Sequence, residues 1–251
     1  MNNITKSKFD SNVVKFQTKI RKNFQLYCFL EDAIFRFAKL YKSEFKDYKF
    51  LNFLDKFKNV SVKKTSEIKK IKYTEILDYG KNLIESELSN LVFVLNMSDF
   101  EAWLVESLNL IFSSDRKMLI TRYLDPEKTP LNLSLVEQSK NIDEVWQRII
   151  DRYLSNKLYD RKEEVLRNLL SACNIKEDKK FKILTGKINE NFLCRNLIVH
   201  NKNKVNKEYL DKAEEYAKFE IGEVVKISKD YLFEQGDNLL FFMQKVRKEL
   251  L

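Results

Sequence analysis

The sequence predicts an all-α protein, and three observations carry this prediction. The 251 residues include only four glycines and two prolines, which are too few turn-forming residues for a fold of many strands. Hydrophobic residues make up 44% of the chain and aromatic residues 13%, so the chain can bury a sizeable core. Apolar residues also recur at intervals of three and four along most of the chain, which is the period of an amphipathic helix.

The first predicted element is a long amphipathic helix from about Ser11 to Asp47, with room for one break. Its apolar positions are Val14, Phe16, Ile20, Phe24, Tyr27, Leu30, Ile34, Phe37 and Leu40. Residues 48–64 form a short segment rich in aromatic residues and lysines, where another short helix can fit. A longer helix is predicted from about Ser66 to Leu95, with Gly80 tolerated in its interior.

A separate helix is expected to begin at Ser98 and to run to about Phe112. Ser98 and Glu101 match a capping box, in which the serine hydroxyl bonds the amide three residues on and the glutamate reaches back. Trp103 is one of the apolar residues that this helix would turn toward the core.

The middle of the chain is less regular. Pro126 and Pro130 bracket a predicted loop, and residues 131–135 alternate in polarity as an extended segment does. Helices are then predicted at 143–154, 161–173, 179–199 and 207–217, followed by one or two short strands within 219–227. A final helix is expected from about Ser228 to Leu251.

The net charge of +9 lies almost entirely in the N-terminal quarter of the chain. Residues 1–70 carry a net charge of +10, whereas residues 71–251 carry a net charge of −1. We therefore divide the chain into a basic N-terminal helical extension, residues 1–70, and a helical domain, residues 71–251. Dense lysines attract polyanions such as RNA. A merely solvated helix face explains them equally well, and the sequence does not decide between the two.

The cysteines and the hydropathy indicate an intracellular protein. Cys28, Cys173 and Cys194 are odd in number and far apart, so we interpret them as reduced, buried thiols. With one histidine and no paired cysteines, we expect no metal and no cofactor. No apolar run reaches the length of a membrane span, and we expect no membrane partner and a cytoplasmic location.

The only histidine of the chain, His200, lies five residues after Arg195 at the end of a predicted helix. Imidazole is the side chain that most readily transfers protons near neutral pH, and arginine binds phosphate with a fixed charge. Asn201 follows the histidine as an expected helix stop.

This motif resembles the RxxxxH signature of the HEPN superfamily. The matching residues are Arg195-Asn196-x-x-x-His200-Asn201, followed by Val205-Asn206-x-x-Tyr209-Leu210. The closest subgroup reads roughly RNxxVHNxGxVN and is found in bacterial toxin and phage-defence ribonucleases. Residues 100–104 and the chain's ending resemble that subgroup too, so the resemblance covers about residues 74–251. Lys202-Asn203-Lys204 departs from it, because the family often has a glycine turn there; Asn203 tolerates the left-handed backbone that such a turn needs.

The resemblance implies an antiparallel helical bundle with a minor β-hairpin, to which residues 1–70 add an extra helical region. It also implies a homodimer in which two motif helices face each other across a cleft. The implied activity is metal-independent cleavage of RNA by 2′-hydroxyl attack, within a toxin or abortive-infection system that could include an antitoxin or another partner protein. Arg195, Asn196 and His200 would be catalytic, and Asn201, Lys202, Lys204 and Glu101 would contact substrate.

The residues by themselves support part of this chemistry. Such cleavage needs a base, an acid and a cation at the phosphate, and His200 and Arg195 can supply these roles. Asn196 and His200 are four residues apart and share a helix face. Five residues, by contrast, separate two Cα atoms by about 7.5 Å along a helix and about 140° around it. One copy of the motif is therefore a poor site alone.

Each assignment has a simpler alternative. His200 could have no role beyond contacting the carbonyls at the helix end. Arg195 could be an ion-pair partner of Glu190 or Glu101. Glu101 is explained as well by the capping box, and Cys194 by helix packing. Two other functions therefore stay open: a catalytically silent scaffold that binds RNA or protein in a defence complex, and a purely structural helical protein that docks through its basic N-terminal region.

Overall fold

The computed structural model describes residues 3–44, 80, 82–124, 136–160 and 162–250. Within these residues the chain forms eight α-helices and no strand, so the all-α prediction is confirmed. The predicted short strands at 219–227, and with them the minor β-hairpin, are wrong. Lys204 and Val224 form only an isolated antiparallel bridge, because the backbone turns at Gly222 with φ +81° before a ladder can extend.

Helix α1, Asn3–Glu44, is a single helix of 42 residues that begins earlier than predicted and has no break. Neither glycine nor proline occurs within it. Its buried face comprises Phe9, Val13, Phe16, Ile20 and Tyr27. Val14, which we had placed on this face, is 46% exposed, because its neighbour Val13 already points into the core.

Helix α4, Ser89–Ser114, passes through Ser98 without interruption, so the predicted helix start there is wrong. A π-helical segment, Leu83–Leu88, leads into it. No helix-breaking residue separates Leu95 from Ser98. The buried Asn96 also anchors this stretch, because its amide donates to Gln235 Oε1 at 3.3 Å and accepts from Asn23 at 3.0 Å.

The remaining predicted helices are confirmed with small changes of their ends. They are α7 (Ile142–Asp160), α8 (Lys162–Ala172), α9 (Lys179–His200), α10 (Lys207–Ala213) and α11 (Lys229–Leu250). A 3-10 turn, Glu214–Tyr216, replaces the last part of the helix predicted to reach Ala217. A short helix α5, Arg116–Met118, and a π-helical segment, Leu119–Tyr123, follow α4.

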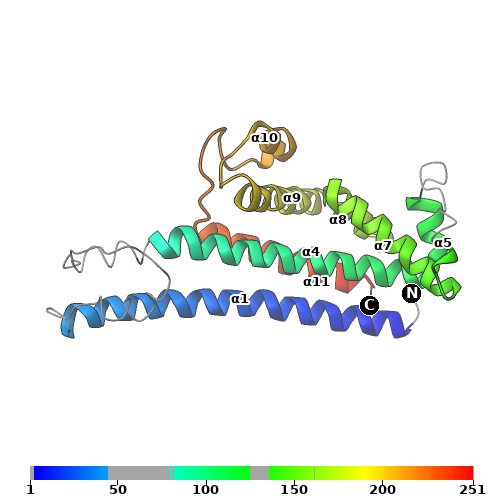
Figure 1. Ribbon diagram of the computed structural model, residues 1–251, viewed down its shortest axis with the longest axis horizontal. Coiled ribbons are helices and arrows are strands. Elements are labelled where there is room, and N and C mark those ends of the chain that lie inside the picture. The colour runs from blue at the N-terminus through cyan, green and yellow to red at the C-terminus, as the bar shows by residue number, and fades with distance from the viewer. Residues whose placement is uncertain (1–2, 45–79, 81, 125–135, 161, 251) are drawn as a thin grey trace.

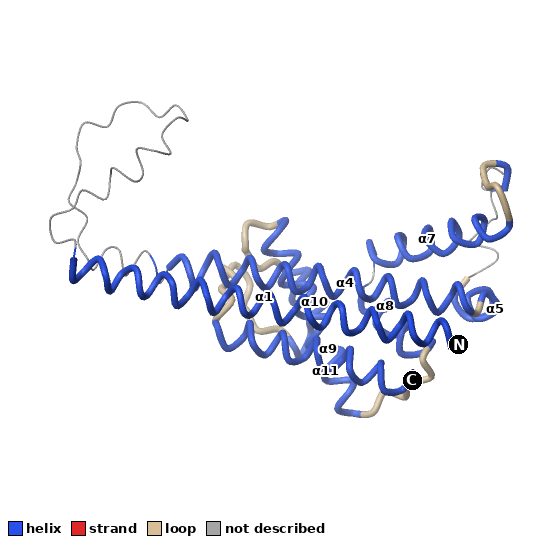
Figure 2. The backbone as a smooth tube through the Cα atoms, turned by 90° about the horizontal axis from the view of Figure 1, so that it is seen from below, coloured by secondary structure: helices blue, strands red, loops and turns tan. Residues whose placement is uncertain are grey.

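Helices α1, α4 and α11 form an antiparallel stack, and α9 packs on it (Figures 1 and 2). Helix α1 runs in one direction and α4 and α11 run in the other, whereas α9 lies obliquely across α4 and α11, with α10 on its outer side. Aromatic rings fill the centre of the stack: Phe100 stacks on Trp103 with centroids 5.5 Å apart, and Phe181 stacks on Phe242 at 5.4 Å. The chain ends lie close together, where Arg247 of α11 pairs with Asp10 of α1.

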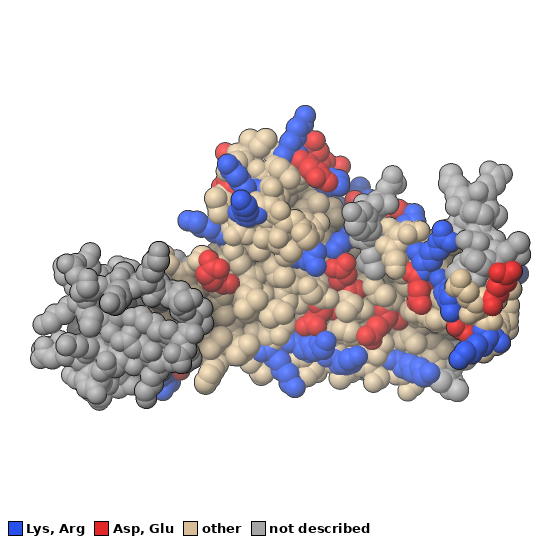
Figure 3. Space-filling model, in the orientation of Figure 1, with Lys and Arg blue, Asp and Glu red and all other residues tan. Residues whose placement is uncertain are grey.

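The described part of the basic N-terminal region packs onto the rest of the bundle. Buried residues of α1 belong to the same core cluster as those of α4 and α11. Lys15 and Lys19 of α1 pair with Glu106 and Asp99 of α4 at 3.7 Å and 3.0 Å. Lysines and arginines line the edge of the molecule that α1 forms in Figure 3.

Several predicted segments lie outside the described residues. They are the segment 48–64, the first part of the helix predicted from Ser66, the loop at Pro126 and Pro130, and the extended stretch 131–135. The cysteines are all unpaired; Cys173 and Cys194 are buried as expected, but Cys28 is exposed, because it lies on the outer face of α1. Among the described helices, none is long and apolar enough to span a membrane.

Candidate active site

Helix α9 carries Arg195, Asn196 and His200, and its start is fixed by a side-chain cap. Asp178 Oδ1 accepts a hydrogen bond from the Phe181 amide at 2.8 Å, in the position where a carboxylate also meets the positive end of the helix. One face of the helix is buried through Phe181, Leu184, Ile188 and Phe192, and Glu190, Cys194 and Leu197 are buried on the opposite side. The cap and this face together fix the directions in which the motif side chains leave the helix.

The end of α9 is held by a left-handed turn. The amides of Asn201 and Asn203 both donate to the Leu197 carbonyl, at 3.0 and 3.1 Å. Lys202 and Asn203 have φ values of 52° and 63°, so the turn forms without the glycine of the family pattern, as expected. The Asn201 side-chain amide donates to the Lys204 carbonyl. Asn201 thus stabilises the turn, and the side chains of Lys202 and Lys204 are exposed.

Arg195 is partly buried, and its guanidinium has spare hydrogen-bonding capacity. Its Nη1 donates to Asn196 Oδ1 at 3.2 Å, and its Nη2 lies 3.9 Å from Glu101 Oε2. Its Nε is buried and has no hydrogen-bond partner. Of the two alternative ion pairs, Arg195 therefore forms the one with Glu101, at a long distance, and does not form the one with Glu190.

Glu101 joins three helices through its carboxylate. Because Ser98 lies inside α4, Glu101 is no capping-box partner, and that interpretation is wrong. Its Oε1 instead accepts a hydrogen bond from Lys162 of α8 at 2.9 Å, while its Oε2 faces Arg195 of α9. Lys162 also lies 5.0 Å from the Phe192 ring centroid. We refer to Glu101, Lys162 and Arg195 as the charge triad.

Sequence reasoning missed Lys162. Glu101 and Lys162 are 61 residues apart, and only the packing of α4, α8 and α9 brings them together. Residue spacing within one helix predicts contacts within that helix, and it cannot predict a contact that depends on how different helices pack together.

His200 is the last residue of α9, and its side chain is exposed. It makes no hydrogen bond or ion pair with any other described residue. Because α9 is regular from Arg195 to His200, the two side chains leave the helix about 140° apart. The structure does not bring them together within one chain, whereas Asn196 lies one turn before His200 on the same side of the helix.

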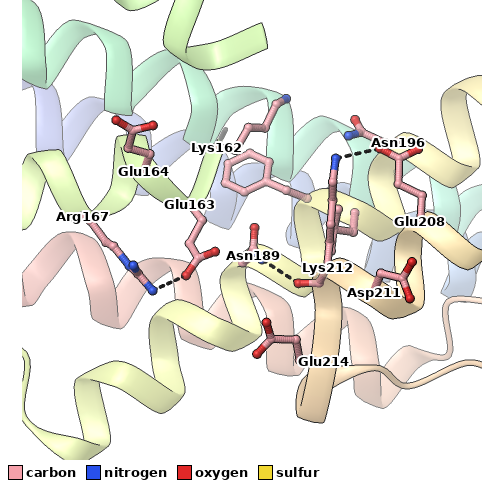
Figure 4. Close-up of a pocket in the computed structure, with 12 residues that line it drawn as sticks. Lys162, Glu163, Glu164, Arg167, Asn189, Asn196, Glu208, Asp211, Lys212 and Glu214 are labelled. Carbon is pink, nitrogen blue, oxygen red and sulfur yellow. Dashed lines mark hydrogen bonds and ion pairs between the residues drawn. The ribbon is translucent and has the colours of Figure 1, made fainter. Parts of the chain in front are cut away.

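A groove of about 520 Å³ opens beside Asn196, between α8, α9 and α10 (Figure 4). Its basic lining residues are Lys162, Arg167 and Lys212, and its acidic ones are Glu163, Glu164, Glu208, Asp211 and Glu214. Glu163 pairs with Arg167 and Glu208 pairs with Lys212. Lys162 and Asn196 lie at one rim in Figure 4, whereas Asp211 and Glu214 lie toward the opposite rim. The Glu208 carboxylate lies beside Asn196 and pairs with Lys212, so this rim carries both signs of charge, whereas Asp211 and Glu214 add only negative charge.

Behind the motif, a buried carboxyl group ties α9 to α10 and α11. Glu190 accepts hydrogen bonds from Cys194 at 3.0 Å, from Tyr209 at 2.7 Å and from Tyr231. Burial raises the pKa of Glu190 above its ordinary value, against the opposing effect of these hydrogen bonds. Burial also raises the pKa of the Cys194 thiol, so Cys194 serves packing and is no activated nucleophile.

No family model, no curated protein and no solved structure matches this chain. Among the residues that the structure describes, no group of three or more His, Cys, Asp or Glu side chains is arranged to hold a metal ion.

Proposed function

We propose that this protein is a metal-independent endoribonuclease of a toxin or phage-defence system, which acts in the cytoplasm on RNA. The observation that carries the proposal is the end of α9. An exposed imidazole, a neighbouring amide and a guanidinium with spare donors occupy one capped helix whose other face is buried. These groups supply one proton-transfer residue and one phosphate-binding cation of those that 2′-hydroxyl attack on a phosphodiester requires.

In the proposed reaction, His200 takes the proton of the 2′-hydroxyl or gives one to the leaving 5′-oxygen. Arg195 stabilises the charge on the phosphate, and Asn196 orients the imidazole or the phosphate. The products carry a 2′,3′-cyclic phosphate and a 5′-hydroxyl. Because Arg195 and His200 diverge on one helix, we propose that a second copy of the chain completes the site across a two-fold axis.

Cleavage of RNA in EDTA tests the proposal. We expect the wild type to cut RNA and to leave 2′,3′-cyclic phosphate ends, and we expect His200→Ala and Arg195→Ala to lose at least about 100-fold in rate. Arg148→Ala is a matched control, because Arg148 also forms an ion pair but lies on α7. Equal trace cutting by all four proteins would identify a contaminant and would refute the proposal.

A second candidate is a helical scaffold that binds RNA or protein without cutting it. The divergence of Arg195 and His200 favours it, because a single chain then has no complete site. The same variants separate the two functions. A scaffold would keep its binding and its biological effect after His200→Ala, whereas the ribonuclease would lose toxicity while it still folds and dimerises.

A further inference from the structure

The charge triad is the least exposed ion-pair arrangement in the part of the chain that the structure describes. The side chains of Lys162, Arg195 and Glu101 are 15%, 21% and 22% exposed. In every other ion pair of the described residues, the cation is at least 33% exposed. Charges removed from water in this way are costly unless a partner compensates them.

The compensation within the triad is incomplete. One carboxylate faces two cations, so the triad carries a net charge of +1. The contact between Glu101 and Lys162 is close at 2.9 Å, but the contact between Glu101 and Arg195 is loose at 3.9 Å. Arg195 Nε has no partner at all. A further anion at this place would supply acceptors that the fold itself does not provide.

The position of Lys162 indicates where such an anion enters. Lys162 and Asn196 line the same groove and lie at the same rim of it (Figure 4). Asn196 is hydrogen-bonded to Arg195, so one side of the triad continues directly into the groove. Asp211 and Glu214 at the opposite rim would repel a phosphate chain that continued along the groove, and Glu208 is already paired with Lys212, so the favourable position is beside Lys162.

We propose that Lys162 is a second phosphate-binding cation of this site and that Glu101 is a positioning residue that holds it beside Arg195. The ligand is a phosphodiester group of RNA. This inference rests on the proposed function for the identity of the ligand, but it concerns binding and not cleavage. Glu101 has two effects here: it orients both cations, and its negative charge weakens their hold on phosphate.

Substitution of Lys162 and substitution of Glu101 should therefore change the affinity for RNA in opposite directions, although the two residues form one ion pair. Lys162→Met removes a cation from the ligand, so affinity for RNA falls by about tenfold, the loss of one charge-assisted hydrogen bond. Glu101→Gln keeps a hydrogen-bond acceptor for Lys162 but removes the competing negative charge, so affinity for RNA rises. A purely structural ion pair would respond in the same direction when it is broken from either side.

The probe is a short fluorescent 2′-O-methyl oligonucleotide, which has no 2′-hydroxyl nucleophile and is not cleaved. Its binding is measured by anisotropy over a range of salt concentrations. With Lys162→Met we expect the slope of log Kd against log salt to fall by about 0.7, the contribution of one contact to a single strand. Lys162→Arg should keep most of the affinity. Lys187→Met is the matched control: Lys187 pairs with Glu234, does not line the groove, and leaves Glu234 with Lys218 as a partner.

Each outcome decides the inference. A loss with Lys162→Met and a gain with Glu101→Gln support it, and unchanged or equal-direction effects overturn it. If Lys162→Met fails to fold, the sign of the Glu101→Gln effect decides alone. If the wild type binds the probe but cuts no natural RNA in EDTA, the ribonuclease proposal is refuted, and the Lys162 and Glu101 variants still test the phosphate site. A wild type that does not bind the probe would overturn both proposals.

Discussion

Glu190 is a buried acid on the same helix as the motif, and no basic side chain bonds it within the described residues. Three donors surround it, and two of them, Tyr209 and Tyr231, come from α10 and the start of α11. Burial is the largest influence on its pKa, and burial favours the neutral form.

This burial predicts a pH dependence of stability with a definite sign. Because the folded-state pKa of Glu190 is raised above the ordinary value of 4.5, the folded protein binds more protons than the unfolded chain just above that pH. The free energy of unfolding therefore falls as pH rises through this window, by up to about 1.4 kcal/mol per pH unit. Glu190→Gln should flatten the profile measured by urea denaturation. The exposed Glu177→Gln should not, and identical profiles for all three proteins would contradict this explanation.

Glycine at position 236 of α11 allows α1 to approach closely. A Cβ atom there would lie 2.2 Å from the Phe24 ring of α1. Alanine normally stabilises a helix by about 1 kcal/mol relative to glycine, but here the clash should dominate. We expect Gly236→Ala to lower the free energy of unfolding by about 1–3 kcal/mol in chemical denaturation. Asp237→Ala, on the exposed side of α11, should cost less than about 0.5 kcal/mol; equal costs for the two variants would argue against the close contact.

At the scale of the helices, the N-terminal cap of α9 at Asp178 can be compared with Ser98, where a helix start was wrongly predicted. Asp178 caps α9, so Asp178→Ala should lower the free energy of unfolding by about 1 kcal/mol. Ser98 lies inside α4, where alanine is the better helix former, so Ser98→Ala should be neutral or stabilise by up to about 0.5 kcal/mol. Thermal unfolding of both variants measures the difference. A loss with Ser98→Ala as large as that with Asp178→Ala would mean that a helix does begin at Ser98.

The same two residues show which elements could be predicted from the sequence. The apolar period and the capping residues are local, and they were sufficient to predict α7, α8, α9 and α11. At Ser98 the local pattern predicted a helix start that does not exist. The sequence pattern Ser-x-x-Glu of a capping box can also occur inside a helix when the preceding residues are helical. The buried Asn96, fixed by Asn23 and Gln235 from two other helices, decided the outcome, and such contacts leave no local signal.

The candidate site divides in the same way. Arg195, Asn196 and His200 were identified from their spacing, and the structure places them on one helix as expected. Lys162 could not be identified, and Glu101 was identified for the wrong reason, because their contact depends on how three helices pack. A short strand pair was expected where the turn at Gly222 allows a single bridge.

At the scale of the whole molecule, α1 covers one side of α4 and α11, and the motif helix lies on the other side of these two helices (Figure 1). The end of α9 stays uncovered within the described residues, with Val199 47% exposed beside His200. In the proposed dimer, a second copy would lie at this uncovered end and complete the site that the divergence of Arg195 and His200 leaves incomplete.

The most direct test of the account is a mixing experiment with the His200→Ala variant. Wild-type protein is unfolded and refolded with increasing amounts of His200→Ala protein at constant total concentration, and RNA cleavage is measured in EDTA. If one site needs both histidines, only wild-type dimers are active, and activity falls with the square of the wild-type fraction. A linear fall would show that each chain acts alone and would contradict the shared site, and no cleavage by the wild type would contradict the account as a whole.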